Sequence, residues 1–314
     1  MRTPNRPRHN GRSAKAAPKK LSSLPALKSL AQKAGPERPG LIYRTNFVSV
    51  ADKALALKYF FGLPAIWESR FSTVRPLAAN QKQRKLLRPV YWLGNWQFAC
   101  LNYYHPPKGT KFRCVEAEPF PPFLQAWVNE IEQLVRREIP EGDVPADWHL
   151  NTCLINYYGQ SRDEEGQWQD VARVGEHRDY EPGPVASVSL GERAFFQFVR
   201  SSSRHQSSST FLSQWLDDRS LQIFAGRLFK DTLFHRVQRV EKKGSLQQAF
   251  PDANFVVRRV NLTFRYVPTK DVQPLREFPA ELIADVLPYV QTLSKSSVHF
   301  AEAFQQATSA KTDP

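Results

Sequence analysis

The stretch Val174-Gly-Glu-His-Arg-Asp-Tyr-Glu181 decides how this chain of 314 residues is interpreted. His177 and Asp179 are two residues apart, and side chains at that spacing point the same way in an extended strand. His235 follows in a later strand-like segment and supplies a third candidate ligand. Two imidazoles and one carboxylate on one side of a metal leave its opposite side open. The pattern therefore predicts a redox-active metal site, although a lone His-x-Asp is common and needs support from the rest of the chain.

Support comes from the alternating stretch Arg259-Val-Asn-Leu-Thr-Phe-Arg265. An ordinary half-buried strand alternates in the same way, with its polar face in water. Here, however, the polar face carries two arginines six residues apart, and a guanidinium binds a carboxylate bidentately. The pair fits an anion with two acidic ends. Asn156 and Tyr158 alternate in the same way and add neutral hydrogen-bond donors.

Taken together, these motifs resemble the AlkB family of Fe(II)/2-oxoglutarate-dependent dioxygenases, and most closely its branch that repairs alkylated bases in duplex DNA. The resemblance covers about residues 88 to 267. Its motifs stand in the family's order: Asn156-x-Tyr158, His177-x-Asp179, His235 and Arg259 to Arg265. It implies that Fe(II) is bound by His177, Asp179 and His235, the ligand set of non-haem iron oxygenases, with 2-oxoglutarate and O2 as co-substrates.

The resemblance also implies how the two ends of 2-oxoglutarate are held. Arg265 and Tyr158 would bind the distal carboxylate of the co-substrate. Asn156 and Arg259 would lie near its metal-chelating end, and Asn261 would order the network between them.

The implied reaction is oxidative demethylation of N-alkyl lesions in DNA, of the 1-methyladenine and 3-methylcytosine type, with release of formaldehyde, succinate and CO2. Glu181 matches the position of an acid that favours a cationic methylated base, unless it only faces solvent. Two departures leave room for the same chemistry on RNA or on a protein side chain. Tyr180 stands where the duplex-repair branch tends to carry an acid, and residues 159 to 173 are longer than the usual connection. A nonenzymatic nucleic-acid-binding protein is a third alternative, which the intact triad opposes.

Leu87 to Trp96 predicts a hairpin with an exposed apolar tip, because the run Tyr-Trp-Leu-Gly ends on a turn residue. In the duplex-repair branch a hairpin at this place carries an apolar wedge, and Leu93, with Trp92 beside it, matches that substrate-binding position. Such a wedge stabilises an extruded base. The alternative is that both side chains belong to the core, as we expect for Trp96. Residues 98 to 105 supply further aromatics for stacking.

Apolar periodicity predicts helices over Val50 to Phe61 and Phe123 to Arg137, and a helical segment over Phe278 to Gln306 that is interrupted near Pro288. The second helix has one apolar stripe: Leu124, Trp127, Val128, Ile131, Leu134 and Val135. From Leu150 to Val267 short β runs alternate with turns, which is typical of a jelly roll.

The fold class predicted is therefore α+β, with a double-stranded β-helix (jelly roll) core, flanking helices and an N-terminal substrate-recognition lid. We expect a disordered basic tail over residues 1–40 and an N-terminal α/β segment with the nucleotide-recognition lid over 41–149. The jelly-roll catalytic core would occupy 150–268, and a C-terminal helical extension 269–314.

The chain has 44 basic and 30 acidic residues and a formal net charge of +14, which favours a polyanionic partner. Residues 1 to 36 contain nine lysines and arginines and no acid. That tail fits a nucleic-acid arm, an organelle transit peptide or a solvated extension. We expect a monomer that acts on nucleic acid, DNA foremost, and does not bind membranes. Three cysteines without CxxC spacing favour a reducing intracellular compartment, the nucleus or the cytoplasm, with organelle import by the tail as an alternative.

Overall fold

The computed structural model describes residues 39–71, 83–96, 114–200, 208–238, 246, 250–273, 277, 287–288 and 290–309. Almost all of the predicted basic tail lies outside these ranges. The aromatic residues 98 to 105 and the first residues of the predicted C-terminal helix, 278 to 286, also lie outside them.

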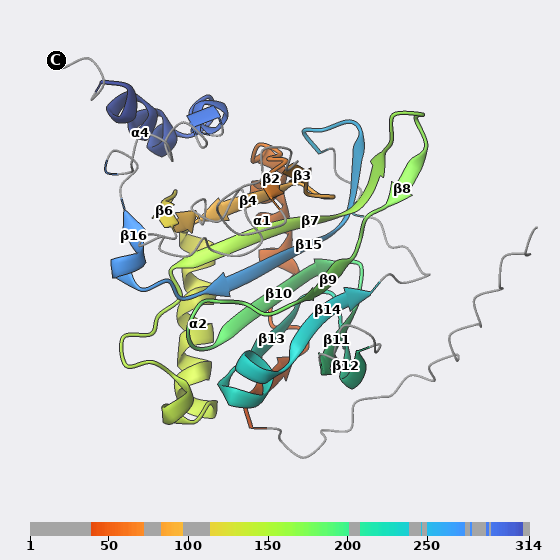
Figure 1. Cartoon of the computed structure of the whole chain (residues 1–314), viewed down its shortest axis with the longest axis vertical. Helices are drawn as coiled ribbons and strands as arrows, with labels where there is room; N and C mark the ends of the chain where they lie inside the picture. The colour runs from red at the N-terminus through yellow and green to blue at the C-terminus, as the bar shows by residue number, and fades with distance from the viewer. Residues whose placement is uncertain are drawn as a thin grey trace, which may run out of the picture. The chain divides into compact units, whose positions relative to one another are not determined.

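Two antiparallel sheets form the core of the described residues (Figure 1). The larger sheet runs β1 (Leu41–Arg44), β13 (Ser220–Phe224), β10 (Val185–Gly191), β15 (Phe255–Arg265), β7 (Thr152–Arg162) and β4 (Val90–Leu93), and β8 (Trp168–Asp170) pairs with β7. The smaller sheet runs β12 (Ser209–Leu216), β11 (Ala194–Arg200), β14 (Phe234–Gln238) and β9 (Val174–His177). This arrangement confirms the predicted α+β class with a jelly-roll core.

The register of β15 brings the predicted polar residues into one row. Asn261 lies opposite Asn156 of β7 on one side and Ser189 of β10 on the other. Two residues along the strand, Arg259 lies opposite Tyr158. Because directly opposed residues in an antiparallel sheet project to the same face, these side chains share the face of the sheet that bears the site.

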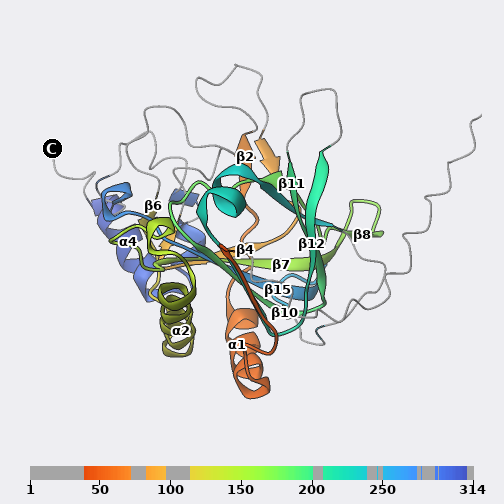
Figure 2. The ribbon, with the colours of Figure 1, turned by 90° about the horizontal axis from the view of Figure 1, so that it is seen from below.

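Both predicted N-terminal helices are confirmed, as α1 (Val50–Gly62) and α2 (Pro122–Glu138). Ser49 caps α1 by accepting a hydrogen bond from the Asp52 backbone N–H at 3.0 Å. All six residues of the predicted stripe on α2 are buried. Figure 2 shows both helices on one side of the larger sheet, with β11 on the other. The helices therefore close the outer face of that sheet and leave its inner face to the site.

The predicted hairpin at Gly94 is wrong. Gly94 has φ of +78°, yet the chain does not double back there. β4 pairs with β7, whereas the next strand, β5 (Asn95–Trp96), pairs with β6 (Cys114–Glu116) in a separate small sheet that also includes β16 (Val272–Gln273). A Cβ on Gly94 would lie 2.1 Å from the Asn151 carbonyl oxygen, so only glycine fits this corner.

Leu93 and Trp92 consequently belong to the core, and the prediction of an exposed wedge is wrong. Leu93 lies opposite Cys153 with 0% of its surface exposed, and Trp92 is 4% exposed. The Trp92 indole donates a hydrogen bond to Oε1 of the buried Glu68 at 2.8 Å. Burial of both side chains leaves neither free to enter a base stack.

The C-terminal part begins with a 3₁₀ turn, Thr269–Asp271, and ends with α4 (Val298–Ser309). Residues 287–288 and 290–293 are helical, and the other residues around the predicted interruption near Pro288, 278–286 and 289, lie outside the described ranges. The break falls at 294–297, where Ser297 accepts a hydrogen bond from the Phe300 backbone N–H at 3.2 Å and so begins α4. The remaining short elements are β2 (Ser69–Phe71), β3 (Gln83–Lys85), a 3₁₀ turn (Glu141–Asp143) and a π-helical turn (Arg227–Thr232). None of the described helices is both long and apolar enough to cross a lipid bilayer.

Candidate metal centre and co-substrate pocket

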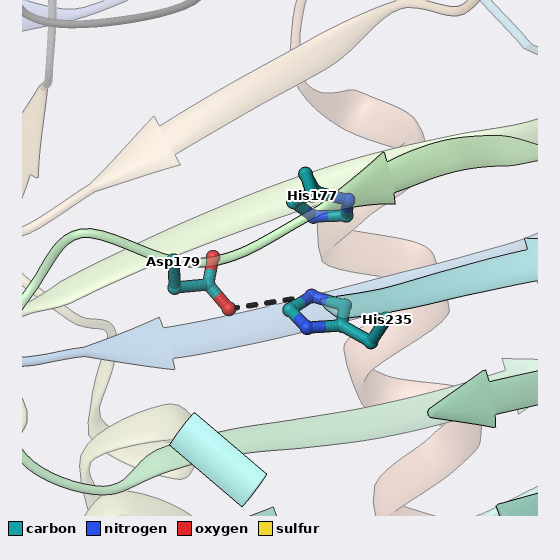
Figure 3. A group of neighbouring side chains, drawn as sticks. All are labelled: His177, Asp179 and His235. Carbon is teal, nitrogen blue, oxygen red and sulfur yellow. Dashed lines mark ion pairs between the residues drawn. The ribbon is translucent and has the colours of Figure 1, made fainter. Parts of the chain in front are cut away.

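His177, Asp179 and His235 come together although β9 and β14 are far apart in the sequence (Figure 3). His177 ends β9 and lies opposite His235 of β14, so pairing of the two strands brings the imidazoles together. Their ring centres are 4.2 Å apart. Asp179 follows two residues after His177, and its Oδ2 lies 3.5 Å from Nε2 of His235. One ligand atom from each residue lies within 4.8 Å of the others, as a shared metal ion requires.

The electrostatics of the triad suit a divalent cation. Burial against Phe196 and Phe224, with His177 close by, lowers the pKa of His235 to about 3, so its imidazole is neutral and a lone pair is available. Burial by itself would raise the pKa of Asp179, but Arg265 and the two imidazoles lower it well below its usual range. Oδ2 of Asp179 is buried without a hydrogen-bond partner. Two imidazoles and an ionised carboxylate with one unsatisfied oxygen are the donor set that Fe(II) takes.

Arg265 forms an ion pair with Asp179, one of the three candidate metal ligands. Its Nη2 lies 2.7 Å and its Nε 2.9 Å from Oδ1 of Asp179, and Glu181 lies 3.5 Å away on the same guanidinium. The predicted partner of Arg265 was Tyr158, for the distal carboxylate. In the structure Tyr158 lies beside Arg259, whereas Arg265 is paired with Asp179. The register of β7 with β15 decides which side chains lie side by side, and it places Tyr158 opposite Arg259.

The second cluster surrounds Arg259, which is 3% exposed. Its Nη2 donates to the Ser189 hydroxyl at 3.0 Å and to Oδ1 of Asn261, and its guanidinium carbon lies 4.9 Å from the centre of the Tyr158 ring. Nε of Arg259 is buried and has no partner. A buried guanidinium held only by neutral groups is poorly compensated, so the surroundings of Arg259 suit a carboxylate.

Two functional candidates were missed in the sequence. Lys230, in the π-helical turn, donates to the backbone carbonyl of Asp179 at 2.7 Å and is 6% exposed. Arg88 donates from Nε to Oδ1 of Asn156 at 2.8 Å and also lies over the Tyr158 ring. No motif surrounds either residue. For Arg88 a signal exists in retrospect, since it is two residues before Val90 and therefore on the same face of an extended chain.

Glu181 lies inside this charged cluster. Its side chain is 12% exposed, and Arg265 and Lys230 both lie near enough to interact with its carboxylate. The alternative in which Glu181 only faces solvent is therefore wrong, and two cations, Arg265 and Lys230, already oppose its negative charge. Tyr180, by contrast, is 49% exposed. Trp92 and Leu93 are absent from the site because they are packed in the core.

The arrangement thus defines one class of site, a two-histidine, one-carboxylate metal centre accompanied by two buried arginines, Arg259 and Arg265. The model for the 2OG-Fe(II) oxygenase superfamily matches residues 40–265. Since the match covers most of the chain, the protein belongs to the 2OG-Fe(II) oxygenase superfamily. It is a dioxygenase that uses Fe(II), 2-oxoglutarate and O2, and the residues of the triad fit the iron.

Solved structures resemble the chain more distantly. OsALKBH1 is 21% identical over 73% of this chain and 99% of its own, with a TM-score of 0.44. A full-length Neurospora crassa protein in complex with alpha-KG is 13% identical over 73% of this chain and 76% of its own, with a TM-score of 0.40. YcfD, a ribosomal oxygenase from Escherichia coli in complex with cobalt and 2-oxoglutarate, is 11% identical over 84% and 66%, with a TM-score of 0.26. No curated protein matches the sequence. All these scores are low, so membership rests on the superfamily match.

Proposed function

We propose that the protein is an AlkB-type oxidative demethylase that removes N-alkyl lesions, of the 1-methyladenine and 3-methylcytosine type, from DNA. The observation that carries the proposal is the arrangement of the AlkB-like motifs: Arg265 of β15 is paired with Asp179 of the metal triad, and Arg259 and Asn261 lie on the same strand opposite Tyr158 and Asn156. The net charge of +14 supports a nucleic acid as the partner.

In this proposal each cluster holds one end of 2-oxoglutarate. Arg259 and Tyr158 receive the distal carboxylate, because Arg259 has an unsatisfied Nε and only neutral partners. Arg265 and Asn156 serve the end nearest the metal, where Arg265 already orients Asp179. Fe(II) with 2-oxoglutarate and O2 supplies an oxidation coupled to decarboxylation, which yields succinate and CO2 and, from an N-methyl group, formaldehyde.

The chain's own contribution is to hold the ligands and keep water away. Phe196, Phe198 and Phe224 pack around His235 and fix its ring in an apolar wall. Arg265 holds one oxygen of Asp179, so the other oxygen stays directed toward the imidazoles. Orientation of ligands by such outer contacts is a common determinant of metal affinity.

A second candidate is the same chemistry on RNA or on a protein side chain. The observation that favours it is the environment of Glu181, whose carboxylate interacts with Arg265 and Lys230. A carboxylate whose charge is already balanced by two cations attracts a cationic methylated base less strongly than an unpaired carboxylate would. Tyr180, the exposed residue at this point of the site, offers a neutral aromatic surface instead.

The test is to incubate the protein with Fe(II), 2-oxoglutarate and ascorbate, and with methylated single-stranded DNA, duplex DNA or RNA. Mass spectrometry of the nucleosides measures lost methyl groups, and succinate measures co-substrate turnover. We expect demethylation of DNA that His177→Ala abolishes. Demethylation of RNA alone would support the second candidate. Succinate formation with no nucleic acid demethylated would exclude both nucleic-acid substrates, and no succinate under any condition would refute the enzymatic proposal.

A further inference from the structure

Arg88 lies at the edge of the larger sheet, in the segment that leads into β4. The Pro89 carbonyl accepts a hydrogen bond from the Tyr157 backbone N–H at 3.2 Å, and Val90 lies opposite Asn156. These contacts fix the backbone of the segment against β7. Arg88, two residues before Val90, then projects to the same face as Asn156 and Tyr158.

The Arg88 side chain makes two contacts on that face. Its Nε donates to Oδ1 of Asn156 at 2.8 Å, and its guanidinium carbon lies 4.9 Å from the centre of the Tyr158 ring. Arg259 approaches the same ring from β15, the strand on the opposite side of β7, and its guanidinium carbon also lies 4.9 Å from the ring centre. Arg88, Tyr158 and Arg259 thus form a row across three adjacent segments of the sheet.

The two cations of this row have neutral hydrogen-bond partners. Arg88 donates to an amide oxygen, and Arg259 donates to the hydroxyl of Ser189 and the amide oxygen of Asn261. Within the described ranges neither guanidinium forms an ion pair. The nearby Glu192 carboxylate is instead bound by Arg258 at 3.0 Å. Burial, together with the charge of Arg88, lowers the pKa of Arg259. Two positive charges on the same tyrosine ring repel each other. A bound anion between them would offset this repulsion by interacting with both.

We propose that Arg88 is a second binding residue for the distal carboxylate of the co-substrate, which it shares with Arg259 and Tyr158. This inference rests on the co-substrate orientation in the proposed function and does not depend on the nucleic-acid substrate. The ligand class is a dicarboxylate. A 2-oxo acid without the distal carboxylate lacks the group that Arg88 binds.

The test measures binding to the Mn(II)-loaded full-length protein by titration calorimetry, with 2-oxoglutarate and with 2-oxovalerate, which lacks the distal carboxylate. Loss of a hydrogen bond to a charged group weakens binding by about 10- to 100-fold. We therefore expect Arg88→Met to raise the Kd for 2-oxoglutarate by about that factor and the Kd for 2-oxovalerate by less than about twofold. Arg162→Met is the matched control, because Arg162 also stacks on an aromatic ring, at 5.0 Å from Trp168, but away from the pocket.

Two results would overturn the inference. An unchanged Kd for 2-oxoglutarate in Arg88→Met would mean that Arg88 does not bind the co-substrate. An equal rise in Kd for both ligands would mean that Arg88 only orients Asn156. Circular dichroism checks the fold, and if Arg88→Met does not fold, the same two titrations on Arg88→Lys decide the matter. Because both titrations use no nucleic acid, failure of the DNA assay leaves their outcome interpretable.

Discussion

Removal of the Asp179 carboxylate tests whether this metal ligand is also the buried counter-ion of Arg265. The two side chains are 5% and 9% exposed and lie 2.7 Å apart. Asp179→Ala leaves the guanidinium buried with Glu181, at 3.5 Å, as its nearest remaining carboxylate. The variant should therefore lose stability even in protein that holds no metal.

The magnitude follows from the burial of the pair. Removing one partner of a buried ion pair costs about 3–5 kcal/mol. Since Glu181 still lies near Arg265, we expect the lower end, about 3 kcal/mol. For a chain of this size that corresponds to a decrease in Tm of roughly 4–6 °C. The double variant Asp179→Ala/Arg265→Met should recover much of the loss, because an apolar replacement of both partners is often nearly neutral.

Urea unfolding in the presence of a chelator measures these free energies without any contribution from metal binding. His177→Ala is the matched control, because His177 is also a candidate metal ligand but forms no ion pair with Arg265; its ring lies against His235, and its Nδ1 is hydrogen-bonded to the Gly175 carbonyl. We expect it to lose metal binding and no more than about 1 kcal/mol of unfolding free energy. The reasoning is refuted if the two single variants lose the same stability, or if Asp179→Ala stays within about 0.5 kcal/mol of the parent protein.

Three further predictions concern the core and the surroundings of the metal. Leu93→Ala should cost about 2–5 kcal/mol of unfolding free energy and reduce demethylation equally on duplex and single-stranded DNA, whereas a loss confined to duplex would restore the wedge interpretation. Lys230→Met should release the carbonyl of Asp179 and raise the Kd for Mn(II) about tenfold, with Lys230→Arg less affected, and an unchanged Kd would contradict this role. Burial raises the pKa of the Cys153 thiol, so iodoacetamide at neutral pH should label Cys153 only in urea, as peptide mass spectrometry would show.

The sequence by itself determined the features that depend on local geometry. The spacing of His177 and Asp179 on an extended chain predicted that both reach one point, and the apolar stripe of α2 follows from the helical period. The alternation of β15 likewise identified its polar face. Neighbouring residues set these patterns, so the sequence could predict the jelly roll, the metal ligands and the class of co-substrate.

Only the tertiary structure decided which strand lies beside which. Pairing of β4 with β7 places Leu93 in the core, and the register of β7 with β15 joins Tyr158 to Arg259 and leaves Arg265 to Asp179. The same long-range packing brings Lys230 and Arg88 to the site. No sequence motif near either residue predicts this position. Such contacts join residues far apart in the chain, and their energies depend on burial and register that local spacing does not specify.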